Sequence, residues 1–172
     1  MNGRRGDESL NRKFGWAKKF GEDEIMLVQT LMPTARQRLT TIEADAPLKD
    51  AAKLLSDTQI SLVVVCAADG AMAGVITKTD VVRQIAQGKE TVFAMPVSAI
   101  MTKEVVLCHS NDLLQEVLSN MRAQGFVHIP VVDQHFRPCG VINARDALRL
   151  LLREAKDEES LIRDYVMGIG YH

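Results

Sequence analysis

The sequence has 172 residues, of which 47% are hydrophobic and 25% are charged, a balance that is typical of a globular domain and excludes a disordered chain. Its formal net charge of −1 gives no bulk attraction for nucleic acid or for an anionic membrane surface, and we expect neither as a partner. No apolar run reaches the roughly 18 residues of a membrane helix, and the charged amino terminus lacks the apolar segment of a secretory signal, so we expect a cytoplasmic protein.

In chain order, the sequence predicts a charged arm, two similar halves and a tail. Residues 1–26 carry clustered charges of both signs and are expected to form a flexible or loosely docked arm. Residues 27–90 and 97–155 form the halves, with 91–96 as their linker and Gly88 as a helix cap. Residues 156–172 have no counterpart after the first half, and we expect this tail to cover an apolar face or to meet a second subunit.

Each half is predicted to run strand, helix, strand, turn, strand, helix. In the first half the β-branched and apolar patterns predict these elements at 39–42, 48–55, 61–65, 69–70, 74–77 and 80–87. In the second half they fall at 105–107, 113–121, 128–132, 137–138, 140–143 and 146–154.

The three cysteines lie in strand-like contexts and form no Cys-x-x-Cys pair. We therefore interpret Cys66, Cys108 and Cys139 as small buried hydrophobic residues.

A heptapeptide recurs at a fixed distance. Gly74–Asp80 reads GVITKTD and Gly140–Asp146 reads GVINARD, and both 140 − 74 and 146 − 80 equal 66. Repetition at one offset indicates a tandem duplication, in which each unit buries its apolar face against its copy.

The repeated segment takes a strand directly into a helix, and this turn can hold a nucleotide. A helix amino terminus offers unpaired N–H groups and partial positive charge to a phosphate, and the Thr77 and Thr79 hydroxyls would add donors. The Asp80 carboxylate can accept hydrogen bonds from the two hydroxyls of a ribose. The structural alternative is that Asp and Thr at this position are ordinary helix caps, contributing about 1 kcal/mol each.

The complete pattern resembles a tandem pair of cystathionine-β-synthase (CBS) domains, also called a Bateman module, of the stand-alone bacterial type. The resemblance rests on the two heptapeptides, on the strand His128–Val132, and on the lead-ins Leu31-Met32-Pro33-Thr34 and Ile100-Met101-Thr102-Lys103. It covers roughly residues 27–155. It implies an α/β (α+β) fold of two pseudo-symmetric βαββα lobes packed through their sheets, with two clefts that bind adenosyl ligands.

The resemblance also implies two ligand sites, whose residues divide between the lobes. In the first, Thr77, Thr79 and Asp80 match the family motif, and the opposite wall would be Phe126, Val127 and His128. In the second, Asp146 keeps the ribose role, Asn143 and Arg145 replace hydroxyl residues, and the opposite wall would be Thr40, Thr41, Ile42, Gln59, Ile60 and Ser61. Arg145 can clamp a phosphate or pair with a neighbouring acid, and His128 can contact ligand or serve only the fold.

Other chemistry finds little support in the sequence. No nucleophile elbow, phosphate-binding P-loop or His-Glu-x-x-His motif is present, and His128, His135 and Cys139 do not have a zinc spacing, so we expect neither catalytic nor metal-binding residues. The expected function is a regulatory module that binds AMP, ADP, ATP, NAD or S-adenosylmethionine, forms a homodimer and signals to an effector protein. The alternatives are a ligand-free dimerisation scaffold and an enzyme that uses NAD or S-adenosylmethionine.

Overall fold

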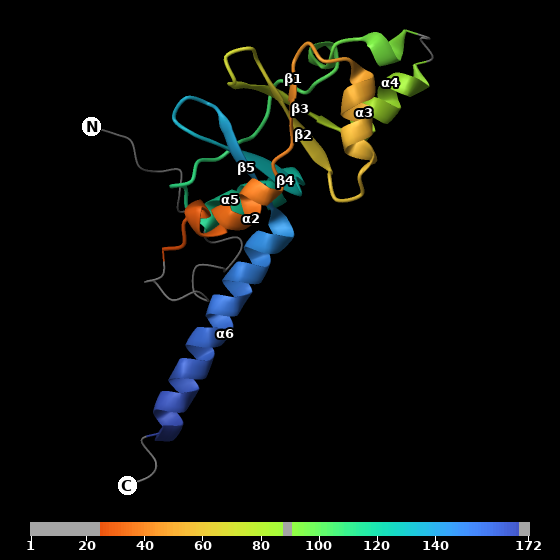
Figure 1. Cartoon of the computed structure of the whole chain (residues 1–172). Coiled ribbons are helices and arrows are strands. Elements are labelled where there is room, and N and C mark those ends of the chain that lie inside the picture. Colours follow the sequence, from red (N-terminus) through yellow and green to blue (C-terminus); the bar gives the residue numbers. More distant parts are fainter. Residues whose placement is uncertain (1–24, 88–90, 169–172) are drawn as a thin grey trace, which may run out of the picture. The chain divides into compact units, whose positions relative to one another are not determined.

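A computed structural model describes residues 25–87 and 91–168 (Figure 1). One compact unit comprises Met26–Leu150, and a second comprises residues 1–25 and 151–172. The helices and strands, in order, are η1 (Val28–Leu31), α2 (Met32–Gln37), β1 (Thr41–Glu43), α3 (Leu48–Ser56), β2 (Leu62–Cys66), β3 (Met72–Thr77), α4 (Lys78–Ala86), η2 (Val92–Ala94), η3 (Val97–Ala99), α5 (Leu114–Gln124), β4 (His128–Val132), β5 (Pro138–Asn143) and α6 (Ala144–Gly168). The predicted Gly88 cap and residues 1–24 of the predicted arm 1–26 lie outside the described residues.

The two repeats share one hairpin design. In the first, β2 pairs antiparallel with β3 and parallel with β1, which gives the order β1-β2-β3. In the second, β4 pairs antiparallel with β5. The strand registers match at the offset of 66, because the pair Leu62↔Thr77 of the first hairpin becomes His128↔Asn143 in the second. A bulge also falls at the equivalent place in both hairpins. The duplication read from the sequence is therefore a duplication of structure.

The first strand of the second repeat does not form as predicted. Residues 105–107 are not in a strand, and the residue that follows them, Cys108, pairs with β4 in a single parallel bridge to Val131. In the first repeat the Val64 N–H donates to the Thr40 carbonyl. The residue equivalent to Val64 is Pro130, which has no N–H to donate, so this ladder cannot be extended.

Each repeat receives the segment that leads into the other. Val92 of the linker and Val97 at the start of the second repeat are buried in the core of the first, together with Leu48 and Ile76. In the reciprocal exchange, the Leu114 N–H of α5 donates to the carbonyl of Met26, and the Val28 N–H donates to the carbonyl of Asp112. Because each lead-in crosses over, neither repeat completes its core alone.

The two sheets meet at a small aliphatic cluster. Val64 and Val75 of the first sheet and Val141 of the second are buried together, with Leu39 and Val105 packed against them. Leu39 and Val105 are themselves separated by 66 residues, so the contact between the sheets follows the internal symmetry.

The heptapeptide glycines allow the lead-ins to approach closely. A Cβ built on Gly74 would lie 2.5 Å from the Thr102 carbonyl oxygen, and one on Gly140 would lie 2.9 Å from the Ala35 Cβ. Both positions therefore require a residue without a side chain.

The last helix is longer than predicted. We expected it to end near residue 154 and a separate tail to follow, whereas α6 continues to Gly168. Residues 155–167 contain neither glycine nor proline, so nothing in the sequence stops the helix. Among the described residues, no helix is both long and apolar enough to span a membrane. All three cysteines are unpaired; Cys108 is buried, and burial raises the pKa of its thiol to about 12.

Candidate functional site

The junction between β3 and α4 is a closed capping box. Thr77 precedes the helix, and both its backbone N–H and its hydroxyl donate to Asp80 Oδ2, at 2.8 and 2.7 Å. In return, the Asp80 N–H donates to Thr77 Oγ1 at 3.4 Å. Arg83 Nη1 lies 3.6 Å from the other carboxylate oxygen. The Asp80 side chain, which is 13% exposed, is thus turned onto its own helix, as the capping alternative expects.

The equivalent junction between β5 and α6 is built differently. Asn143 Oδ1 accepts from the Arg145 N–H at 2.8 Å, so the asparagine caps the helix without help from Asp146. Its amide nitrogen faces His128 Nε2 at 2.9 Å. Because the amide oxygen is occupied by Arg145, the nitrogen is the donor, and His128 Nε2 must accept with its proton on Nδ1.

Asp146 is released from capping and pairs across the repeats instead. Arg38, at the carboxyl end of α2, donates from Nε to Asp146 Oδ2 at 2.8 Å, and its Nη2 lies 2.6 Å from the same oxygen. Asp146 Oδ1 has Arg149 Nη1 at 4.0 Å. The Asp146 side chain is 16% exposed and that of Arg38 is 36% exposed. The contact joins residues 108 positions apart in the sequence.

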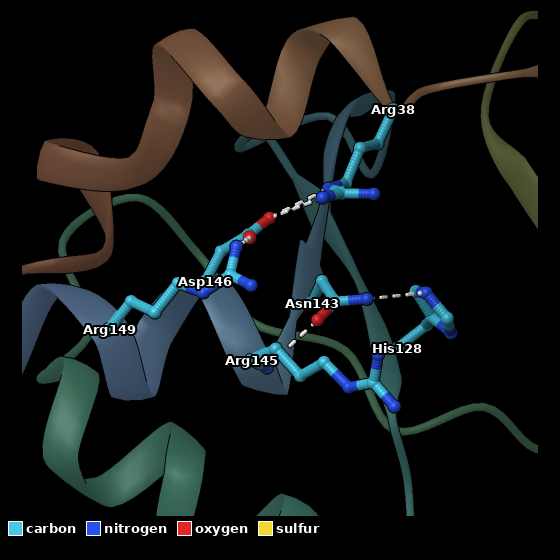
Figure 2. A network of polar contacts seen from close by, with 6 residues as sticks. All are labelled: Arg38, His128, Asn143, Arg145, Asp146 and Arg149. Atoms are coloured by element: carbon cyan, nitrogen blue, oxygen red, sulfur yellow. Dashed lines mark hydrogen bonds and ion pairs between the residues drawn. The ribbon is translucent and has the colours of Figure 1, made fainter. Parts of the chain in front are cut away.

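Figure 2 shows these side chains as one polar group that surrounds the start of α6. Three guanidinium groups, those of Arg38, Arg145 and Arg149, accompany the single carboxylate of Asp146. Arg145 is exposed, and its side chain extends toward His128. The group therefore carries an excess of positive charge beside a helix amino terminus, an arrangement suited to an anion.

The protonation of His128 is linked to this group. Burial, and then the neighbouring Arg38 charge, lower the pKa of His128 below its ordinary value, whereas Asp146 opposes the shift. A neutral ring is also what the hydrogen bond from Asn143 requires, since a protonated imidazole has no lone pair to accept it.

The structure brings together part of the predicted site. His128, Asn143 and Asp146 gather at the second junction, and the Val127 carbonyl accepts from the N–H of Ala144 there. The contribution of Phe126, Val127 and His128 to a ligand at the first junction stays a prediction. Thr79 is exposed, and so are Thr41, Gln59 and Ser61, whereas Thr40, Ile42 and Ile60 are half-buried.

Sequence reasoning missed Arg38 and Arg149. Arg149 could have been found from the repeat, because Arg83 and Arg149 differ by 66 and each follows its aspartate by three residues. Arg38 had no such signal. It lies two residues before the predicted wall that begins at Thr40, and its partner is in the other repeat.

Solved structures share this architecture. A CBS-domain-containing protein from Agrobacterium tumefaciens is 28% identical with a TM-score of 0.62, over 76% of this chain and 96% of that one. A CBS domain pair crystallised in complex with 5′-methylthioadenosine and S-adenosyl-L-methionine is 25% identical with a TM-score of 0.61, over 73% of this chain and 99% of that one.

A curated relative is the L-aspartate semialdehyde sulfurtransferase of Methanocaldococcus jannaschii, 28% identical over 110 residues. That match covers 64% of this chain and only 21% of the enzyme. The profile of the CBS domain matches residues 31–87 and 97–153, more than half of the sequence, and the chain therefore belongs to the CBS domain family as a tandem pair.

Proposed function

We propose that this chain is a regulatory module that binds an adenosyl ligand without transforming it. The observation that carries the proposal is the contact between Arg38 and Asp146. Arg38, in the lead-in segment of the first repeat, meets the carboxylate of Asp146 in the first turn of the last helix of the second repeat. A small molecule held at this point would touch both repeats, and its binding would depend on how they are arranged.

The chemistry of the second junction matches the parts of such a ligand. The two oxygens of Asp146 can accept hydrogen bonds from the hydroxyls of a ribose. The helix amino terminus and the guanidinium groups of Arg38 and Arg145 supply donors and positive charge for phosphate groups. The half-buried Thr40 and Ile42 lie a few residues beyond Arg38, where they can contribute to the wall of the site.

The comparisons support an adenosyl ligand. The CBS domain pair at 25% identity was solved with two molecules that both contain an adenosyl group, 5′-methylthioadenosine and S-adenosyl-L-methionine. The candidates for this chain are AMP, ADP, ATP, NAD and S-adenosylmethionine. The match to the sulfurtransferase covers 21% of that enzyme, so we do not assign its activity to this chain.

The regulatory output follows from the site's position. A ligand that binds one arrangement of the repeats more tightly shifts the population toward that arrangement by its difference in affinity. We propose that the module acts as a homodimer in the cytoplasm and transmits this shift to an effector protein.

A second function is favoured by one observation, which is the closed capping box at Asp80. An aspartate used entirely for its own helix needs no ligand, and if Asp146 were likewise only structural, the chain would be a dimerisation scaffold.

Thermal melting of the full chain separates the two functions. We expect one or more of the five candidates, at 100 times its dissociation constant, to stabilise the fold by about 2.7 kcal/mol. For a chain of this size this corresponds to a rise in Tm of roughly 5–10 °C. The Asp146→Ala variant should melt cooperatively without that rise. If no candidate raises the Tm at millimolar concentration, the scaffold is the better account.

A further inference from the structure

The two strand–helix junctions occupy equivalent places, yet their charges differ. Arg83 and Arg149 correspond at the offset of 66 and lie beside Asp80 and Asp146, so this cation is common to both. Thr79 corresponds to Arg145, which adds a positive charge to the second junction alone. Lys78 corresponds to Ala144, but its ammonium group donates to the Asp57 carbonyl.

The largest difference is at the position of Arg38. At the same offset this residue corresponds to Glu104. The residues that follow them, Leu39 and Val105, pack against the same central cluster, so the correspondence holds in the fold as well as in the sequence. The second junction thus receives an arginine from the other repeat, where the first has an acid at the equivalent position.

The two aspartates also differ, because the groups that occupy the carboxylate oxygens are easier for a ligand to displace at Asp146 than at Asp80. Asp80 Oδ2 already accepts two hydrogen bonds from Thr77, so the two hydroxyls of a ribose could use both carboxylate oxygens of Asp80 only by breaking the capping box. Within residues 25–87 and 91–168, the oxygens of Asp146 are held by arginine side chains alone. Side chains can exchange one partner for another without undoing the first turn of a helix.

From these differences we propose that only the second junction takes a ligand, that this ligand is an adenosine nucleotide bearing phosphate, and that Arg38 is the residue that selects it. The proposal rests on the proposed function and narrows it. A ribose that engages Asp146 competes with Arg38 for Oδ2. A ligand with phosphate gives Arg38 a new anionic partner next to the sugar. Adenosine offers no anion there, and S-adenosylmethionine places its cationic sulfonium there, with its carboxylate farther along the methionine chain.

Arg38 therefore discriminates in two ways. It attracts phosphate, and it penalises adenosyl ligands that lack an anion near the sugar. Removing Arg38 should weaken binding of AMP but leave binding of adenosine unchanged or improved. The ratio of the two affinities reports this role, and a general loss of structure would not change it selectively.

Titration calorimetry of the full chain with AMP, adenosine and S-adenosylmethionine tests the proposal. For the wild type we expect one AMP per chain and tighter binding of AMP than of adenosine. Arg38→Glu, which copies Glu104, and the milder Arg38→Gln should reduce AMP affinity by about 10–100-fold, the range for losing a hydrogen bond between charged groups. The control is Arg36→Glu, at an exposed position of α2, which makes the same charge change as Arg38→Glu. It should leave the ratio of AMP to adenosine affinity unchanged.

The failures of the two proposals are distinguishable. If the wild type binds none of the adenosyl ligands, the proposed function fails and this inference fails with it. If the wild type binds AMP but Arg38→Gln keeps the ratio of AMP to adenosine affinity, or if two AMP molecules bind per chain, the inference alone is overturned. The melting temperature of each variant identifies any that does not fold, and Arg38→Gln keeps the test available if Arg38→Glu is one of these.

Discussion

Replacing Asp80 by alanine should cost stability and leave ligand binding intact. The carboxylate accepts hydrogen bonds from the N–H and the hydroxyl of Thr77 at 2.8 and 2.7 Å, and it lies in the first turn of α4. Loss of the Asp80 half of the capping box costs about 1 kcal/mol, and loss of an acid from a helix amino terminus adds up to about 1 kcal/mol. We therefore expect a total near 1–2 kcal/mol, or a fall in Tm of roughly 2–8 °C.

The matched control is Asp146→Ala at the equivalent position. Its helix keeps the Asn143 cap, and the lost pair with the partly exposed Arg38 should cost less than about 1 kcal/mol. Urea unfolding and calorimetry on both variants give the comparison. Asp80→Asn, which retains one carbonyl acceptor for the Thr77 N–H, should recover part of the loss. The reasoning is refuted if Asp146→Ala is the more destabilising change, or if Asp80→Ala abolishes ligand binding.

Three further predictions concern the fold and its dependence on pH. Gly74→Ala should destabilise by about 1–3 kcal/mol, and by more than Gly140→Ala, because its Cβ would lie 2.5 Å from the carbonyl oxygen of Thr102, which is tied into a backbone bridge; equal melting temperatures would contradict this. Phe136→Gly should stabilise by about 1 kcal/mol, because Phe136 has φ +56° and is 57% exposed, and a lower Tm would contradict it. The pKa of His128 is lowered in the fold, so the stability that the neutral ring contributes should be complete above the ordinary pKa near 6.5 and should fall as the pH drops below it. Urea unfolding at pH 5 and 7.5 should show a smaller decrease in the free energy of unfolding for His128→Gln than for the wild type. An equal decrease in both proteins would count against a neutral His128 in the fold.

The fold could be predicted from the sequence because the duplication relates each element to its copy. The offset of 66 located both hairpins and both strand–helix junctions. The same offset predicts a first strand in the second repeat that does not form, because Pro130 has no N–H to donate to the ladder. The sequence does indicate the full length of α6, because no glycine or proline interrupts residues 155–167.

The candidate site was harder to predict than the fold. Asp146 and Asn143 belong to the repeated motif and were found. Arg38 was not found, because its contact with Asp146 depends on the lead-in of one repeat reaching the other, and nothing local distinguishes it from the exposed Arg36 on the same helix. The opposite states of Asp80 and Asp146 were likewise not predictable from two similar heptapeptides. They follow from the residue at one equivalent position of the two repeats. Thr77 offers a hydroxyl to its aspartate, whereas Asn143 uses its amide to cap the helix and to hold His128.

The central claim is that the carboxylate of Asp146 holds the sugar of an adenosine nucleotide between the two repeats. Calorimetric titration of AMP into the wild type, with Asp80→Ala and Asp146→Ala measured alongside, tests it most directly. The claim predicts one binding event per chain in the wild type and in Asp80→Ala, and its loss in Asp146→Ala. AMP that binds Asp146→Ala as tightly as it binds the wild type would contradict it.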